Sequence, residues 1–88
     1  MRRRAVRPNG DSDMHNADIL IHIDETLNDE AVHSLEREMG SEEGILSACM
    51  HERARHLMLV DFDARQVRPS HIVQWVRNRG LHAEMVGL

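Results

Sequence analysis

Apolar and polar residues alternate in several short stretches of the chain, with the period of a β-strand. The first stretch covers 17–24 and carries isoleucine at every second position, at Ile19, Ile21 and Ile23. Because side chains of a strand point alternately to its two faces, this pattern predicts a strand with one buried side. Three further stretches with strand character follow, at 45–52, 56–63 and 81–86. The stretch at 56–63 is apolar on both sides, which predicts a central position in a sheet.

Between the first two predicted strands, apolar residues recur every three or four positions, which is the period of a helix with one buried face. The buried stripe consists of Ala31, Val32, Leu35 and Met39. Thr26 or Asn28 can cap the start of this helix, and Gly40 can end it.

A second helix is predicted after the third strand. Pro69 suits its beginning, Ser70 can cap it and Gly80 can stop it. Its inward stripe consists of Ile72, Val73 and Val76. The order strand, helix, strand, strand, helix, strand with right-handed crossovers gives a four-stranded antiparallel sheet with two helices on one face. The predicted fold class is therefore α+β, as a ferredoxin-like βαββαβ sandwich.

The residues before the first strand are polar and basic, with arginine at positions 2, 3, 4 and 7. Segment 1–16 cannot cover a core and is predicted to be a disordered tail, so the domain is predicted to span 17–88. Met14 lies just before the domain, and one hypothesis is that translation begins there. No apolar run suits a signal peptide or a membrane span. A soluble cytoplasmic protein that does not contact membranes is expected.

Composition excludes several function classes. The net charge of −4 argues against general affinity for nucleic acid, and Phe62 is the only aromatic residue in the predicted strands, where an RNA reader would place several. Cys49 is the only cysteine, which excludes an internal disulfide and a zinc site with several thiolates in one chain. A reducing compartment fits this cysteine usage best.

No arrangement of residues predicts catalysis. The chain has no glycine-rich phosphate loop and no nucleophile with a base and an orienting group, so it is predicted not to be an enzyme. Acylphosphatases share the predicted topology, but in that family an arginine after the first strand holds the phosphate. Segment 25–29 contains no basic residue here, and an acidic loop would repel the anion.

The second half of the chain has a recognisable order of residues. These are Gly44-Ile45 before the second strand, Val60-Asp61-Phe62-Asp63 at the end of the third, Ile72 and Val76 four residues apart, Gly80, and Ala83 in the last strand. In this order and spacing the chain resembles the heavy-metal-associated domains. Because the first strand and helix also match, the resemblance covers 17–88.

The resemblance implies a fold but not a copper site. In that family, a Met-x-Cys-x-x-Cys loop after the first strand binds Cu(I) or another soft metal through two thiolates. Placing Leu35 on the family's usual helix leucine sets the two cysteine positions near Asp24 and Leu27, and neither is cysteine. The chain therefore resembles a degenerate member of the family without its metal motif.

Other residues offer candidate ligands for a metal ion. The face of the sheet away from the helices is expected to carry His22, Cys49, His51 and His82. With the usual strand order four, one, three, two, His22 would approach His82 and Glu84, a set suited to Zn, Ni or Cu(II). The segment Cys49-Met50-His51 is a second candidate. No pair has the spacing of a recognised motif, so polar surface histidines and no bound cofactor are the first expectation.

Four apolar residues are expected on the same open face, where they would meet solvent in a monomer: Leu20, Leu57, Leu59 and Val86. An apolar patch across central strands usually marks an interface, either with a second copy or with another protein. The alternative is that His and Arg stems cover the leucines. The first hypothesis is thus a non-catalytic interaction module working through the open face, with a protein partner or as a homodimer. The alternative is a metal-binding or metal-trafficking accessory protein.

Overall fold

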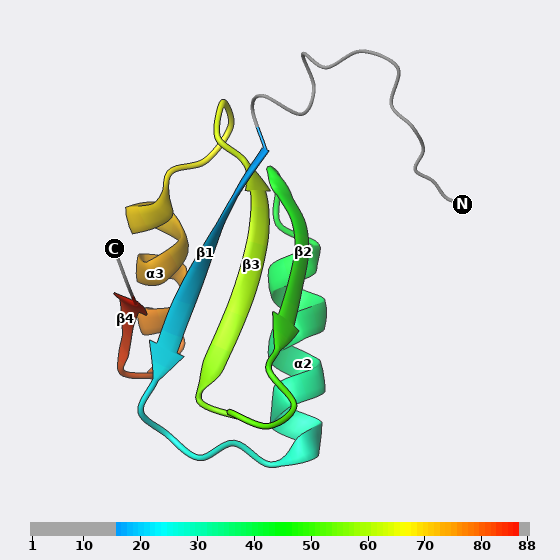
Figure 1. The fold of residues 1–88 in the computed structure, drawn as a ribbon, viewed down its shortest axis with the longest axis vertical. Coiled ribbons are helices and arrows are strands. Elements are labelled where there is room, and N and C mark those ends of the chain that lie inside the picture. The colour runs from blue at the N-terminus through cyan, green and yellow to red at the C-terminus, as the bar shows by residue number, and fades with distance from the viewer. Residues whose placement is uncertain (1–15, 87–88) are drawn as a thin grey trace, which may run out of the picture.

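A computed structural model describes residues 16–86, and residues 1–15 and 87–88 lie outside the described part. The predicted tail at 1–16 therefore falls almost wholly outside it. The elements appear in the predicted order (Figure 1): β1 (Asn16–Ile23), α2 (Asp29–Gly40), β2 (Ile45–Met50), β3 (Leu57–Asp63), α3 (Pro69–Arg77) and β4 (Ala83–Val86). Neither helix in the described residues is long and apolar enough to cross a bilayer.

The sheet has the strand order β2-β3-β1-β4, and each neighbouring pair is antiparallel. This confirms the predicted order and the ferredoxin-like fold, with β3 in the interior. Figure 1 shows α2 and α3 behind the sheet, on the same side, while the front of the sheet carries no helix. The sheet therefore has one packed face and one open face.

The core lies between the sheet and the helices. Ile21 and Ile23 are fully buried, as the alternation in β1 predicted, and β3 contributes Met58, Val60 and Phe62 to the same side. The helices add buried residues at helical spacing, namely Val32, Leu35 and Met39 from α2 and Ile72, Val73 and Val76 from α3.

At the start of the two helices, one predicted capping residue is confirmed and the other is wrong. Asn28 caps α2, because its side-chain oxygen accepts a hydrogen bond from the backbone N–H of Ala31 at 2.8 Å. Ser70 does not cap α3. The cap residue is Arg68, which makes no side-chain hydrogen bond to the helix, and Pro69 is the first helical residue. Proline prefers this first position because its φ is already helical, so Ser70 falls inside the first turn.

A polar bridge joins the two helices. Just after α3, Arg79 forms an ion pair with Glu38 of α2, and its guanidinium lies 4.8 Å from the ring centroid of Trp75. The ion pair and the cation–π contact hold the end of α3 against α2.

Both outer strands have features that limit pairing at their free edges. β4 has only four residues. In β2 the backbone N–H of Met50 donates to the carboxylate of Glu36 in α2, at 2.7 Å, and the register against β3 shifts between Ile45 and Ser47. Short edge strands, irregular register and covered donors are the features by which sheets avoid pairing edge to edge.

A tight turn follows β3. The buried carboxylate of Asp63 accepts hydrogen bonds from the backbone N–H of Arg65 at 2.9 Å and from the amide of Gln66 at 3.0 Å. Hydrogen bonds from the Arg65 side chain, and next from Gln66, hold the pKa of Asp63 well below its usual range. Gly44 lies against this turn with a φ of 88°, and its carbonyl accepts the N–H of Asp63 at 2.8 Å.

Candidate functional site

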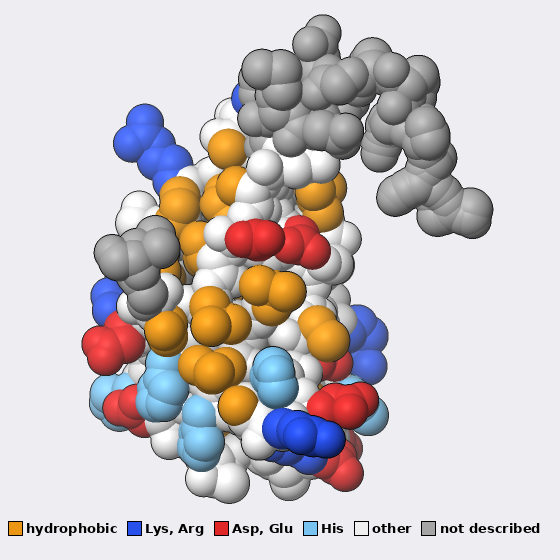
Figure 2. Space-filling model, viewed as in Figure 1, with side chains coloured by type: hydrophobic (Ala, Val, Ile, Leu, Met, Phe, Trp, Pro, Cys, Tyr) orange, Lys and Arg blue, Asp and Glu red, His pale blue; other side chains and the backbone are white. Residues whose placement is uncertain are grey.

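The open face of the sheet carries an apolar row that crosses all four strands. Leu59 of β3 lies directly opposite Cys49 of β2 on one side and Leu20 of β1 on the other, and Leu20 in turn lies opposite Val86 of β4. We refer to Cys49, Leu59, Leu20 and Val86 as the apolar row. Figure 2 shows hydrophobic side chains gathered across the middle of this face. Leu59 is the most exposed leucine of the row, at 44%.

Two carboxylates lie on one side of the apolar row. Asp18 of β1 and Asp61 of β3 are direct cross-strand partners, and we refer to them as the acidic end. Ser47 of β2 donates a hydrogen bond from its hydroxyl to Asp61 at 2.9 Å. Neither carboxylate forms an ion pair within residues 16–86. Figure 2 shows two acidic side chains next to each other on this face, with hydrophobic side chains above and below them.

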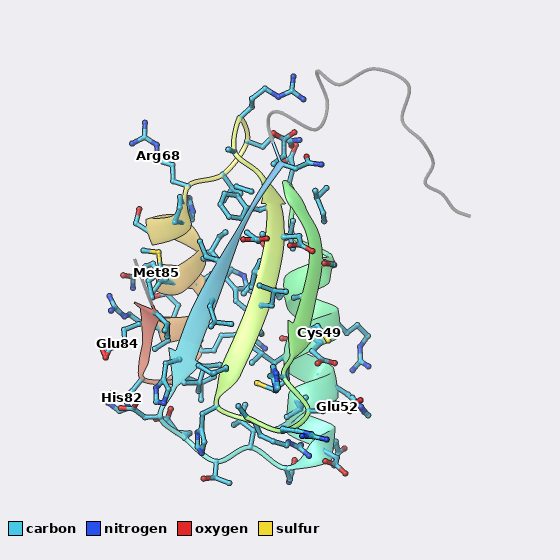
Figure 3. The ribbon with its side chains drawn as sticks, viewed as in Figure 1. Cys49, Glu52, Arg68, His82, Glu84 and Met85 are labelled. Atoms are coloured by element: carbon cyan, nitrogen blue, oxygen red, sulfur yellow. The ribbon has the colours of Figure 1, made fainter. Side chains whose placement is uncertain are left out.

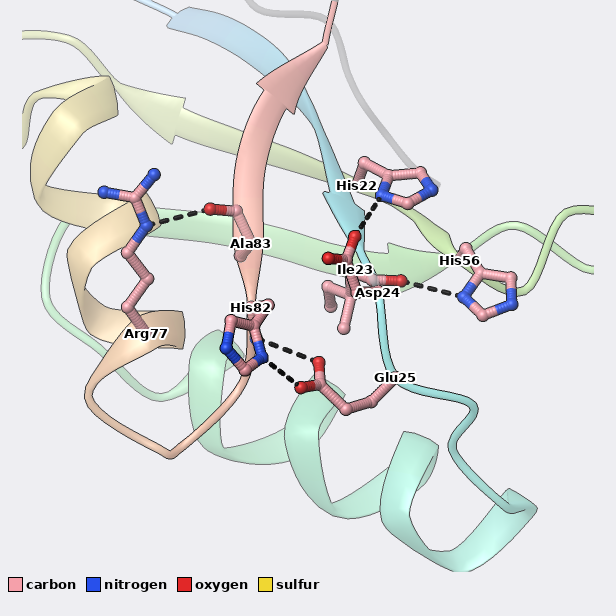
Figure 4. Close-up of polar contacts among 8 residues, drawn as sticks. All are labelled: His22, Ile23, Asp24, Glu25, His56, Arg77, His82 and Ala83. Carbon is pink, nitrogen blue, oxygen red and sulfur yellow. Dashed lines mark hydrogen bonds and ion pairs between the residues drawn. The ribbon is translucent and has the colours of Figure 1, made fainter.

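Histidines lie on the other side of the row. His22 of β1 is opposite Leu57 of β3, and its ring stacks on that of His56 with centroids 5.8 Å apart. The Nδ1 atom of His22 lies 3.2 Å from the carboxylate of Asp24. His56 shares a hydrogen bond of 2.8 Å with the carbonyl of Ile23 (Figure 4). We refer to His22 and His56 as the histidine end.

The structure separates the two halves of the predicted metal-ligand group. Figure 3 shows Cys49 at one edge of the sheet, on β2, and His82 and Glu84 at the other edge, by β4. His51 uses Nδ1 to accept the backbone N–H groups of Arg53 and Ala54, both at 3.1 Å, and so shapes the turn between β2 and β3. Its role in the structure is that of a turn residue.

His82 also has a partner that the sequence did not indicate. Its backbone N–H and its Nδ1 atom contact the two carboxylate oxygens of Glu25, at 2.9 and 2.6 Å (Figure 4). We call this pair of contacts the Glu25–His82 clamp. Of the predicted set, only His22 and Glu84 are direct strand partners.

Neither predicted ligand set forms a cluster. Within residues 16–86, no three His, Cys, Asp or Glu side chains are placed together so that they could hold a metal ion. His22 and Glu84 are strand partners, whereas the Nδ1 atom of His82 contacts Glu25. Binding of Zn, Ni or Cu by these residues stays a prediction of the sequence.

Comparison with known proteins bears on the fold. No protein-family model and no curated protein sequence matches the chain. A solved structure of a copper-binding domain from HMA7, a P-type ATPase, is similar with a TM-score of 0.70 and 18% identity, over 80% of this chain and 93% of that one. The chain has the fold of the heavy-metal-associated domains. A second similar structure, described as "Crosstalk between Cu(I) and Zn(II) homeostasis", has a TM-score of 0.68 and 17% identity, over 80% and 99% of the two chains.

In this heavy-metal-associated fold, the loop between β1 and α2 is held by polar contacts. Asp24 donates its N–H to the carbonyl of His82 at 2.9 Å, and its carboxylate faces His22. Leu27 packs against the core. The resemblance aligned positions near Asp24 and Leu27 with the family's two cysteines, and here one side chain contacts the ring of His22 and the other is partly buried.

The Glu25–His82 clamp makes the pH dependence of this loop predictable. The hydrogen bond from His82 lowers the pKa of Glu25 below 4.5, and the hydrogen bond to Glu25 raises the pKa of His82 above 6.5. The contribution of His82 to the stability of the folded state is complete below pH 6.5, and it is lost as the pH rises through the pKa of His82 in the folded chain. The contribution of Glu25 is complete above pH 4.5, and it is lost as the pH falls through the pKa of Glu25 in the folded chain. The clamp therefore contributes most between these two values.

We expect the His82 ring to titrate at a higher pH in the wild type than in a Glu25→Gln variant, because the variant cannot supply the negative charge. The measurement is an NMR titration of the His82 ring signals. Glu84→Gln is the matched control, since it removes a carboxylate from β4 without touching the clamp. Equal His82 midpoints in wild type and Glu25→Gln would show that the clamp does not form in solution.

Sequence reasoning missed three participants in the site. Asp18 and Asp61 follow the same alternation as the leucines, so the pattern contained the signal for them. His56 gave no such signal. The alternation of the third strand would place its side chain with the core, but His56 precedes β3, and its ring turns toward Ile23 and His22.

Proposed function

We propose that this chain is a non-catalytic binding module that engages a protein through the open face of its sheet. The observation that carries the proposal is the apolar row, which is continuous across four strands and is covered by neither helix. Single exposed apolar residues are common on protein surfaces, but a contiguous patch is typical of a binding surface.

The exposure of Leu59 argues against an interpretation in which neighbouring polar side chains cover the leucines. At 44% exposure, this residue of an interior strand remains open to solvent. Stacking of a partner on the row would remove that apolar surface from water, which is favourable by about 25 cal/mol per Å².

The polar residues beside the row support binding more than catalysis. The Sγ atom of Cys49 lies 3.7 Å from the carbonyl of Met50, and the Nδ1 atom of His51 is occupied by backbone donors. A thiol needs a nearby base or cation to become a strong nucleophile, and these contacts supply neither. An exposed free thiol also fits a reducing, cytoplasmic location.

A Leu59→Glu variant tests the proposal. We expect the immobilised wild-type chain to retain a protein from an extract of its own cells, and Leu59→Glu to retain at least tenfold less of it. A buried unpaired charge at a central contact costs several kcal/mol, and about 1.4 kcal/mol already corresponds to tenfold. The measurement is quantitative mass spectrometry of the retained proteins, which include the chain itself.

Ser70→Glu is the matched control, because it adds the same charge at an exposed residue of α3, in the layer behind the sheet. It should retain the protein as the wild type does. Retention that is equal for Leu59→Glu and the wild type, or no retention by the wild type, would contradict the proposal.

A further inference from the structure

The outward residues of the two central strands follow one order. In β1 they are Asp18, Leu20 and His22, so an acid and an imidazole lie two residues on either side of a leucine. In β3 the direct partners of these residues are Asp61, Leu59 and Leu57. The open face therefore has an acidic end, an apolar middle and a histidine end, with the Leu20–Leu59 pair at its centre.

From this pattern we infer that the partner of the open face is a second copy of the chain, stacked sheet to sheet with its strands antiparallel to those of the first. The inference rests on the proposed function and names the partner. The two-fold axis would lie midway between the two sheets. It would run perpendicular to the strands and pass over the Leu20–Leu59 pair. Each leucine then meets its counterpart, as a self-complementary interface requires.

The same rotation exchanges the two ends of the face. Because Asp18 and His22 are equally far from Leu20 along β1, Asp18 of each copy lies over His22 of the other. Two acid–imidazole pairs then flank the apolar middle. Stacked sheets of this kind lie about 10 Å apart and are aligned to within about 30°, which leaves room for these side chains.

Charge selects this orientation over the other two-fold arrangement. With the axis along the strands, the acidic ends of the two copies would meet, and four carboxylates from Asp18 and Asp61 would share one layer. Like charges brought together in an interface cost several kcal/mol. Asp18 has no ion-pair partner within residues 16–86 of its own copy, and the antiparallel arrangement supplies one in His22 of the other copy.

The pairing depends on the groups around His22. Asp24 lies beside His22, Glu84 is opposite it and His56 is stacked on it. Asp24 and Glu84 are carboxylates, so within the histidine end it is the imidazole of His22 that can attract the second copy's Asp18.

Sedimentation equilibrium of the full chain tests the inference through an exchange of charges. Asp18→Lys places a lysine over His22 of the other copy, and His22→Glu places a glutamate over Asp18 of the other copy, so like charges meet in both variants. In the double variant, the introduced lysine of each copy lies over the introduced glutamate of the other, which restores two pairs of opposite charge. Because each single variant removes both acid–imidazole pairs, at about pH 6 it should weaken dimerisation about tenfold or more. The double variant should return to within about threefold of the wild type.

Circular dichroism of every variant verifies that the sheet is intact. Leu59→Glu should be monomeric at every concentration tested, and Ser70→Glu should dimerise like the wild type.

A wild-type chain that stays monomeric at millimolar concentration would overturn the inference, and so would a double variant no better than the single ones. If another protein is still retained in a Leu59-dependent manner, the proposed function stands and only the identity of the partner is wrong. A dimer that survives Leu59→Glu would instead place the contact on another surface.

Discussion

Replacing Phe62 by alanine is expected to leave a large fraction of the protein unfolded at room temperature. Phe62 is only 2% exposed and lies at the inward side of β3, between the sheet and the helices. Removing a buried phenylalanine side chain costs about 3–5 kcal/mol, because hydrophobic transfer is lost and a cavity remains. A small domain has only about 5 kcal/mol in total at the low end of the usual range. The measurement is urea denaturation followed by far-ultraviolet circular dichroism.

Leu59→Ala is the control for this prediction, because Leu59 belongs to the same strand but points to the open face. It should change the free energy of unfolding by less than about 1 kcal/mol when measured at low protein concentration. If the two variants were equally destabilised, the assignment of the two faces of β3 would be wrong.

Gly44→Ala should have the next largest effect on stability. The backbone φ of Gly44 is 88°, a left-handed conformation that costs an alanine about 1–2 kcal/mol. A Cβ atom there would also lie 3.1 Å from the Cβ of Gln66 and 3.3 Å from a methyl group of Val67. Because both neighbours belong to the turn that follows Asp63, they cannot move without disturbing it. We expect a total loss of about 2–3 kcal/mol, measured by the same urea titration.

Two other glycines distinguish the cost of the left-handed backbone from the cost of the steric contact. Gly80 has a φ of 87° but nothing within 4 Å of an added Cβ, so Gly80→Ala should show the backbone cost alone. Gly40 ends α2 with ordinary φ and open space around it, and Gly40→Ala should be neutral or stabilising by up to about 1 kcal/mol. An effect of Gly44→Ala no larger than that of Gly80→Ala would show that the contact with the turn contributes nothing.

The sequence was informative wherever a local period determines which side a residue faces. Ile21 and Ile23 lie in the core because a strand alternates, and the fixed topology then determined which residues share the open face. The same logic placed Leu20 and Leu59 on that face, and the register between β1 and β3 makes them direct partners. Asn28 could be anticipated as a cap because its amide satisfies a backbone donor at short range.

Contacts between distant loops could not be predicted in this way. His82 follows a turn that has no period, so no local pattern pairs it with Glu25, which is 57 residues away. In the structure the ring of His82 contacts Glu25, and no group of three metal-ligand side chains is found within residues 16–86. The error at Ser70 has a different cause, since two local preferences competed and the preference of Pro69 for the first helical position won.

The two edge strands of the sheet limit how further chains can add to the molecule. Because β4 is so short and the outer N–H of Met50 in β2 is already bonded to Glu36, neither border is an easy template for another chain to extend the sheet. Stacking of two copies through the open face buries that face in both of them. An assembly built in this way is complete at two chains, and concentrated solutions should stay clear and free of fibrils.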